Sequence, residues 1–172
     1  MRLLFYCTLC LFINSLSFAQ SETNANKNIA MDYMEAYGNW DFDKMKTFYS
    51  ENIHFEDPTA NDAFKQPFVF DGKEKVYQFF KNVFEGKFEN AKPSYVNFII
   101  EKSFTSGSHT VVNSTFECVL PTSWFAKNSN ETIFISIPFT TILTIENGLI
   151  TTHIDYGNYT KYFEQINAQI QK

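Results

Sequence analysis

YMEAYGNWDFDKMKTFYSENIHFEDP, residues Tyr33 to Pro58, is the stretch that decides the fold. Its pattern predicts a helix, a break at Gly38-Asn39, a second helix and a short strand. Apolar and polar residues alternate from Ile53 to Glu56, as is typical of a half-buried strand, and Pro58 ends that strand. Because the residue before a proline is pushed out of the helical region, Asp57 is expected to be extended. An acid therefore stands where the third apolar element stops.

One more helix is predicted between this stretch and the sheet region. Residues 20–27 are polar and are expected to form a loose lead-in. Asp41 is predicted to cap the second helix, and Asp71 with Glu74 resembles the capping pair of a third. Residues 59–70 are predicted to be a loop, too apolar for a solvated linker, that folds back as a lid or rim. The predicted buried faces are Ile29, Ala30, Tyr33, Met34 and Tyr37; then Phe42, Met45, Phe48 and Tyr49; then Val76, Phe79, Phe80, Val83 and Phe84.

After Ser94 the period changes to that of strands. Residues 95–104 and 109–120 flank a hairpin turn at Ser106-Gly107, and residues 132–145 and 149–156 form a second hairpin. Pro138 predicts a bulge or bend, residues 121–131 form a polar loop, and residues 159–170 favour a short terminal helix. The order is that of an α+β protein. We expect three N-terminal helices packed in a strongly curved, mostly antiparallel sheet, with a cone-shaped cavity lined by aromatic residues.

The first nineteen residues have the features of a secretory signal. One basic residue precedes an apolar run from Leu3 to Leu16, which is too short to span a bilayer comfortably, and small residues lie at 17 and 19. We expect cleavage after Ala19, and a secreted or periplasmic protein without a membrane anchor. Residues 20–172 then form a single domain whose only cysteine is Cys118, so burial of its many phenylalanines and tyrosines must stabilise it.

Charge excludes several classes of partner. The 172-residue chain has a formal net charge of −5, and Arg2, inside the predicted signal, is its only arginine. Nucleic acid and anionic membranes require a basic surface, and arginine clamps on phosphate or carboxylate are impossible in the mature chain. His54, His109 and His153 show no metal-ligand spacing, and we expect no metal or other cofactor.

Two groups of polar residues are candidates for chemistry. The first is Asp57 with Tyr33 and Tyr37, which lie one helical turn apart on one face. The second is His153 with Asp155, which alternation places on the same face of the last strand. Each group also has a purely structural interpretation. Asp57 is then a turn residue, the tyrosines are core residues, and the last-strand pair faces solvent.

From Tyr33 to Pro58, and again from Gly72, at residues 114–117 and at Pro138, the chain resembles the ketosteroid isomerases within the nuclear transport factor 2-like and SnoaL-like superfamily. The resemblance rests on the first-helix tyrosine, the Gly-x-x-Asp break and the strand ending Glu-Asp-Pro. It implies Tyr33 as the oxyanion donor and Asp57 as the catalytic base. Thr140 occupies the position of the second, acidic donor and is a weaker substitute. His153 and Asp155 look like positions that SnoaL-like cyclases carry on their last strand.

The resemblance implies binding of a small hydrophobic molecule, and the predicted signal implies that the protein is exported. As an enzyme it would be isomerase- or cyclase-like, acting on a hydrophobic carbonyl compound, with Asp57 as base, Tyr33 as donor, and Asp155 and His153 assisting. The alternative is non-catalytic binding of an apolar ligand or a protein partner, because fold alone does not confer chemistry. The resemblance also implies a homodimer. The expected ligand-binding residues are Tyr37, Phe55, Phe116, Trp124 and Thr140.

Overall fold

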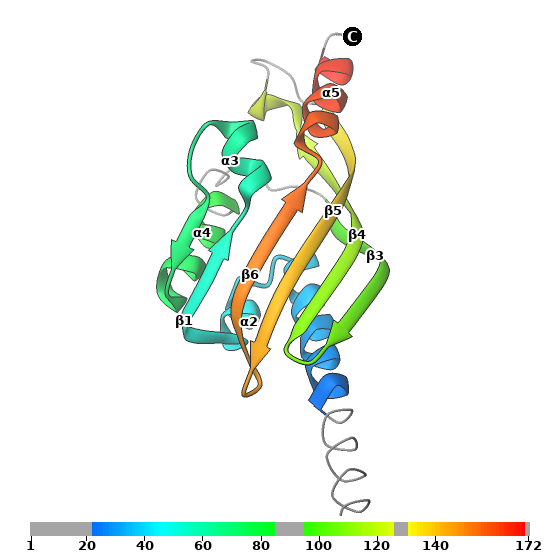
Figure 1. The fold of residues 1–172 in the computed structure, drawn as a ribbon. Coiled ribbons are helices and arrows are strands. Elements are labelled where there is room, and N and C mark those ends of the chain that lie inside the picture. The colour runs from blue at the N-terminus through cyan, green and yellow to red at the C-terminus, as the bar shows by residue number, and fades with distance from the viewer. Residues whose placement is uncertain (1–21, 85–94, 126–130, 171–172) are drawn as a thin grey trace, which may run out of the picture.

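The structure is a computed structural model that describes residues 22–84, 95–125 and 131–170 (Figure 1). The predicted signal segment, residues 1–19, and the middle of the predicted 121–131 loop lie outside the described residues. Where the chain is described, no helix is both long and apolar enough to cross a bilayer.

A helix over residues 22–38 opens the described chain. It begins earlier than predicted, because residues 22–27 are helical rather than a loose lead-in. The reason is a tertiary contact: the Asn26 amide is buried and donates to the carbonyl of Gly107 at 3.0 Å. At the other end, a Cβ on Gly38 would lie 3.4 Å from the backbone nitrogen of Phe98, so glycine allows the helix to approach the sheet closely.

The next helix is shorter than its apolar pattern suggests. Helix α2 (Phe42–Thr47) is capped by Asp41, whose carboxylate accepts from the Lys44 N–H at 3.0 Å, as predicted. Tyr49, expected on this helix, instead begins strand β1 (Tyr49–Glu56). The cause is pairing with the sheet, since the carbonyl of Phe48 accepts from the N–H of Ile150 at 2.8 Å.

The predicted loop at 59–70 contains regular structure. Helix α3 (Pro58–Phe64) has Asp57 as its N-cap and Pro58 at its first position, a favoured combination for starting a helix. It ends at Lys65, which adopts φ 56°. Strand β2 (Val69–Asp71) then pairs with β1. Helix α4 (Lys73–Phe84) follows and buries Val76 and Phe80; the side chains of Val83 and Phe84 lie outside the described part.

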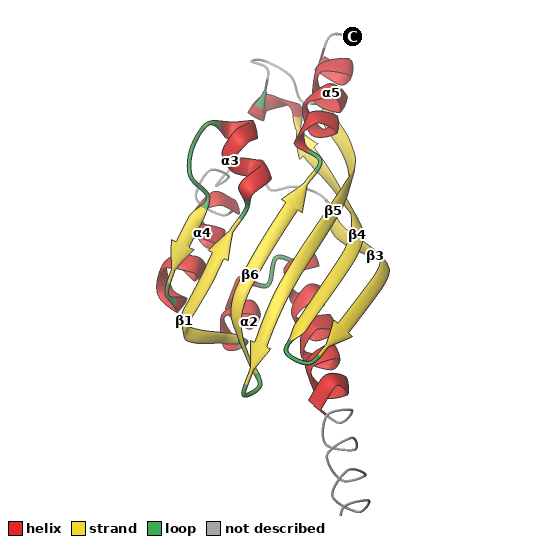
Figure 2. Cartoon of the chain, in the orientation of Figure 1, coloured by secondary structure: helices red, strands yellow, loops and turns green. Residues whose placement is uncertain are grey.

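The remaining elements follow the predicted order closely. Their bounds are β3 (Tyr95–Ser106), β4 (His109–Pro121), the 3-10 turn η1 (Thr122–Trp124), β5 (Thr132–Glu146), β6 (Leu149–Gly157) and α5 (Tyr159–Ile170). The six strands form one mixed sheet of order β2-β1-β6-β5-β4-β3, in which only β1 and β6 run parallel. The residue 22–38 helix, α2 and α4 lie against one face of the sheet, and α3 and α5 lie at one end (Figure 2). The predicted α+β class is confirmed.

Pro138 does not produce the predicted bulge between β4 and β5. Pairing of these strands is continuous through it, with Pro138 opposite Thr115. The carbonyl of Pro138 accepts from the N–H of Asn158, just past the end of β6. The two main-chain groups of a strand residue point to the same side, so the missing N–H of Pro138 falls where β6 has ended. The proline therefore costs no strand pairing.

Beyond that point helix α5 replaces β6 along the edge of β5. The Gln165 side chain accepts from the N–H of Ser136 at 2.9 Å and donates to its carbonyl at 2.8 Å. Gln169 makes the same pair of bonds to Phe134, at 3.0 and 2.8 Å. Two amide side chains, one helical turn apart, thus satisfy an otherwise open strand edge and fix the position of α5.

Candidate functional site

A cavity of about 570 Å³ lies between the helices and the inner face of the sheet. Its volume is in the range typical of small-molecule sites. Its wall is mainly aromatic, with a few polar side chains among the rings. The lining residues are Tyr37, Trp40, Phe55, Asp57, Phe64, Gln66, Phe68, Phe79, Phe80, Phe98, Phe116, Cys118, Leu120, Ser123, Trp124, Phe125, Ile137, Phe139, Asp155, Tyr159 and Tyr162.

Asp57 reaches the cavity from the junction of β1 and α3. It is extended, with φ −129°, and is 4 % exposed. Its Oδ1 accepts from the Ala60 N–H at 2.8 Å and from the Thr59 hydroxyl at 2.6 Å. Its Oδ2 accepts from the hydroxyl of Tyr159 at 2.6 Å. The carboxylate is thus held on both oxygens, and Oδ2 retains capacity for a ligand.

The surroundings of Asp57 stabilise its protonated form more than bulk water would. Burial raises the pKa of Asp57, and the nearby charge of Asp155 adds to this effect. The hydrogen bonds from Thr59, Tyr159 and Ala60 oppose it without cancelling it. A raised carboxyl pKa in an apolar cleft is characteristic of catalytic acids and bases.

His153 and Asp155 also face inward, and a bulge sets this orientation. On β6, Thr152 pairs with Thr144 and Ile150 pairs with Ile145, so Thr151 is the extra residue. The bulge lets Ile150 and His153 share the buried face although their numbers differ in parity. The predicted solvent-facing alternative for the pair is wrong, since His153 is 0 % exposed and Asp155 1 %.

These two residues belong to a buried hydrogen-bonded chain. The Tyr49 and Tyr33 hydroxyls lie 2.9 Å apart, and the Tyr33 hydroxyl lies 2.8 Å from Nδ1 of His153. His153 Nε2 lies 2.9 Å from Oδ1 of Asp155, and Tyr37 donates to Oδ2 of Asp155 at 2.9 Å. The chain runs from Tyr49, at the start of β1, to the cavity, where Tyr37 and Asp155 line the wall.

The tyrosines of this chain remain neutral donors. Burial raises the pKa of Tyr33 well above its usual value, as does its neighbour Tyr49. Burial and then the negative charge of Asp155 do the same for Tyr37. Phenolate forms are therefore disfavoured, and these hydroxyl groups donate hydrogen bonds rather than accept protons from a substrate.

The predicted site residues occupy three different positions. Asp57, Asp155, Tyr37, Phe55, Phe116 and Trp124 all line the cavity. Tyr33 and His153 are fully buried behind the wall and reach it through Asp155. Thr140 lies on the other side of β5, where its hydroxyl donates to Asn113 at 3.0 Å. Strand alternation turns the next residue inward instead, and Thr141 donates to Oδ1 of Asp155 at 2.7 Å.

Sequence reasoning missed three residues that hold the carboxylates: Thr59, Thr141 and Tyr159. Thr59 follows an Asp-Pro pair at the third position of a capped turn, a local signal that was available. Thr141 and Tyr159 lie 14 and 102 residues from their partners, and no local pattern links them.

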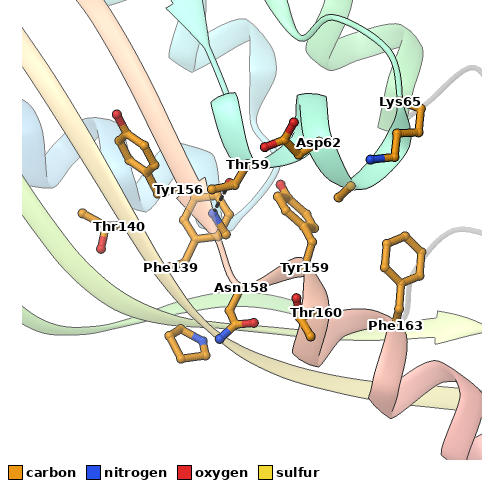
Figure 3. A pocket seen from close by; sticks show the side chains of 13 residues that line it. Thr59, Asp62, Lys65, Phe139, Thr140, Tyr156, Asn158, Tyr159, Thr160 and Phe163 are labelled. Carbon is orange, nitrogen blue, oxygen red and sulfur yellow. Dashed lines mark hydrogen bonds between the residues drawn. The ribbon is translucent and has the colours of Figure 1, made fainter.

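A second hollow of about 710 Å³ lies on the outside, between α3, the middle of β5, the end of β6 and the start of α5. Figure 3 shows Asp62 of α3 and Lys65, just past its end, across this groove from Thr160 and Phe163 of α5. The rings of Tyr159 and Phe139 line both this outer groove and the inner cavity. Among the described residues, no group of three or more His, Cys, Asp or Glu side chains is suited to hold a metal ion.

Comparison with solved structures places this geometry in a known fold. The chain is similar to a protein provisionally described as a SnoaL-like polyketide cyclase from Shewanella putrefaciens, with 24 % identity and a TM-score of 0.68 over 83 % of this chain and 96 % of that one. It is similar to a ketosteroid isomerase-like protein from Catenulispora acidiphila in complex with trimethylamine, with 14 % identity and a TM-score of 0.60 over 81 % and 92 %. It is also similar to TerC co-crystallised with polyporic acid, with 12 % identity and a TM-score of 0.62 over 83 % and 98 %.

The sequence itself supports the same conclusion. No curated protein matches the chain. Residues 30–153, however, match the family model of the SnoaL-like domain, which covers the N-terminal helix, Asp57 and most of the sheet. The predicted resemblance is confirmed: the chain belongs to the SnoaL-like domain family and has the nuclear transport factor 2-like, ketosteroid isomerase-like fold.

Proposed function

We propose that this protein is an enzyme that moves a proton on a hydrophobic carbonyl compound in an isomerisation or a cyclisation. One observation carries the proposal: Asp57, a nearly buried carboxylate with a raised pKa, opens on an aromatic cavity beside a second carboxylate, Asp155. A base of this kind is poised to take a proton from carbon next to a carbonyl group.

In this mechanism Asp57 is the general base. Thr59 and the Ala60 N–H fix Oδ1, so Oδ2 is the oxygen that accepts the proton. The hydroxyl of Tyr159 donates to Oδ2, which keeps a lone pair available for the substrate. After transfer, the neutral carboxyl group suits its apolar surroundings and can return the proton to another carbon of the same substrate.

Tyr37 is the donor placed to stabilise charge on the substrate oxygen. It lines the cavity, whereas Tyr33, predicted for this role, lies behind the wall. As negative charge develops on the substrate, the Tyr37 hydroxyl can turn from Asp155 to that oxygen. Asp155 keeps its bonds to Thr141 and His153 during this exchange. We therefore assign Tyr33 and His153 as positioning residues that act through Asp155.

Ligands of relatives support a small-molecule site. The Catenulispora relative is in complex with trimethylamine and TerC was co-crystallised with polyporic acid, a small amine and a larger organic acid. The aromatic wall of this cavity suits a flat, apolar molecule, because ring stacking adds to the area buried.

Deuterium incorporation tests the proposal without knowledge of the true substrate. A panel of hydrophobic ketones is incubated with the protein in D₂O, and deuterium at the carbon next to the carbonyl is measured by mass spectrometry. The protein should accelerate exchange for some members, and Asp57→Asn should lower that rate by about 10²–10⁴-fold. Asp62→Asn, an exposed acid one turn along α3, is the matched control and should leave it unchanged. Full exchange in Asp57→Asn contradicts the assignment.

Non-catalytic binding is the second candidate function, and one observation favours it. Asp57 is the N-cap of α3, so the structure has a use for this carboxylate that requires no chemistry. On this hypothesis, the exchange assay shows no acceleration, while hydrophobic ligands still bind in the cavity.

Two further proposals concern the context of the protein. We propose that residues 1–19 direct export and are removed, which mass spectrometry of the secreted or periplasmic protein tests. We propose a homodimer formed through the outer sheet face, where Ile99, Phe104 and Phe134 are exposed. Sedimentation at a series of concentrations tests it, and a monomer throughout contradicts it.

A further inference from the structure

The charges around the inner cavity are unbalanced. Two carboxylates, Asp57 and Asp155, line it. None of the described residues in its wall is a lysine, an arginine or a histidine. The remaining polar wall groups are hydroxyl, amide, indole and thiol groups. Whether the cavity is negative or neutral therefore depends on the protonation of the two acids and of buried His153.

Matching the hydrogen-bond donors to acceptors assigns one negative charge to the His153–Asp155 pair. Asp155 accepts from the Tyr37 and Thr141 hydroxyls, and a proton on Nε2 of His153 supplies the third donor. With Nδ1 unprotonated, Tyr33 donates to it and Tyr49 donates to Tyr33, so every hydroxyl has an acceptor. A doubly protonated imidazole reverses this direction and leaves the Tyr49 hydroxyl without an acceptor among the bonds found in the described chain. The satisfied arrangement is neutral His153 beside ionised Asp155.

Asp57 is a second carboxylate that accepts three hydrogen bonds. The Thr59 hydroxyl accepts from the N–H of Gly157 at 2.9 Å, so its own proton is free for Asp57. The Thr59 hydroxyl, the Ala60 N–H and the Tyr159 hydroxyl thus all donate to the Asp57 carboxylate. Such a set stabilises the ionised form and opposes, without cancelling, the rise in the pKa of Asp57 that burial causes. Two acids therefore face an apolar space with no cation of the described wall between them.

We propose that this cavity selects hydrophobic ligands that carry a protonated amine. The inference rests on the proposed function in that it names the charge of the substrate for the same cavity. An ammonium group between the two acids supplies the missing counter-charge where the surroundings screen it poorly. Aromatic faces attract the same group, as in known sites for quaternary ammonium ions. A carboxylate or phosphate ligand of equal size meets two like charges there and is rejected.

Three probes of nearly equal shape test the proposal with the full chain. They are 1-adamantanemethylamine, 1-adamantanemethanol and 1-adamantanecarboxylate, which are cationic, neutral and anionic at neutral pH. None absorbs where tryptophan does, and the only two tryptophans of the chain, Trp40 and Trp124, both line the cavity. Their fluorescence reports binding directly. The cation should bind about tenfold tighter than the alcohol, a difference within the range of cation–π and ion-pair contacts, and the anion should not bind measurably.

Substitution of single acids tests the cause. Asp57→Asn keeps the cap of α3 and removes one charge, so it should lower the preference for the cation over the alcohol several-fold. Asp62→Asn removes one charge from the outer groove, on the same helix that Asp57 caps (Figure 3). It should leave the preference as in the wild type, which separates the cavity charges from the net charge of the protein.

Three outcomes overturn the inference: equal affinity for the cation and the alcohol, tightest binding of the anion, or the same loss of preference in Asp62→Asn as in Asp57→Asn. These results are independent of catalysis. If the deuterium assay succeeds and the probes show no charge preference, the proposed function stands and this inference fails. If the cation is preferred and no exchange is catalysed, this inference stands and the proposed function fails.

Discussion

Two substitutions at Asp57 separate its role as a helix cap from its role as a charge. Asparagine keeps a side-chain oxygen for the Ala60 N–H and can donate to the hydroxyl of Tyr159. Alanine removes the cap and leaves the hydroxyls of Thr59 and Tyr159 without their acceptor. We therefore expect the two variants to differ in stability although both lack the carboxylate.

The size of the difference follows from the bonds lost. An N-cap replaced by alanine costs about 0.5–2 kcal/mol. Each buried donor left unsatisfied costs about 1–3 kcal/mol, at the low end here because Thr59 and Tyr159 are only half-buried. Asp57→Ala should then be roughly 2–4 kcal/mol less stable than Asp57→Asn. For a chain of this size, that means roughly 2–4 °C in Tm for each kcal/mol.

The wild type adds a dependence on pH. Burial raises the pKa of Asp57 above its ordinary value of 3.8, so the folded protein binds this proton more tightly than the unfolded chain. Protonation of Asp57 therefore stabilises the folded protein. This stabilisation is fully present below pH 3.8 and is lost as the pH rises through the folded-state pKa. Asparagine is neutral at every pH. Asp57→Asn should therefore equal or exceed the wild type at neutral pH, with a gap that closes in acid.

Urea unfolding, followed by tryptophan fluorescence and circular dichroism, measures all three proteins at neutral pH and below the ordinary aspartate pKa. Equal stability of the Asn and Ala variants shows that the cap contributes nothing. A gap between Asp57→Asn and the wild type that does not narrow in acid refutes the argument from the buried charge.

Three other changes have defined outcomes. Gln165→Ala removes both bonds to the backbone of Ser136 and should cost about 1–3 kcal/mol in urea unfolding, whereas exposed Asn167→Ala on the same helix should change stability by less than about 0.5 kcal/mol. Tyr33→Phe leaves Nδ1 of His153 without its donor; we expect a loss of about 1–3 kcal/mol in the same assay and slower deuterium exchange, with affinity for the adamantane probes kept. Burial raises the pKa of the Cys118 thiol to about 12, so peptide mapping after iodoacetamide treatment should find it alkylated only in urea, and rapid alkylation of the native protein contradicts its burial.

Local patterns predicted most of the elements, because helices and strands have distinct periods. Period-two alternation and the Asn147-Gly148 turn predicted the ends of β5 and β6 to within a residue or two. Both residues of that turn have positive φ in the structure. The errors lie where distant segments intervene. Residues 22–27 are already helical because Asn26 bonds the β3–β4 turn, and Tyr49 leaves its helix because β6 pairs beside it. Only α3 had a local signal that was missed, the Asp57-Pro58 start.

The candidate site shows the same division. Helical spacing puts Tyr33 and Tyr37 on one face, about 6 Å apart along the axis. No local pattern says which of the two reaches the cavity and which lies behind His153. Strand alternation correctly paired His153 with Asp155, but the direction of their face depends on the bulge at Thr151.

The sequence by itself determined the order of elements, the apolar faces and the types of polar residue available for chemistry, since these depend on period, turn residues and composition. Tertiary structure alone decided which polar groups meet. Tyr159 reaches Asp57 across 102 residues of chain, and it does so because Gln165 and Gln169 hold α5 against the edge that β6 leaves open. A contact of that kind is a property of packed elements, and the charge balance of the cavity depends on it.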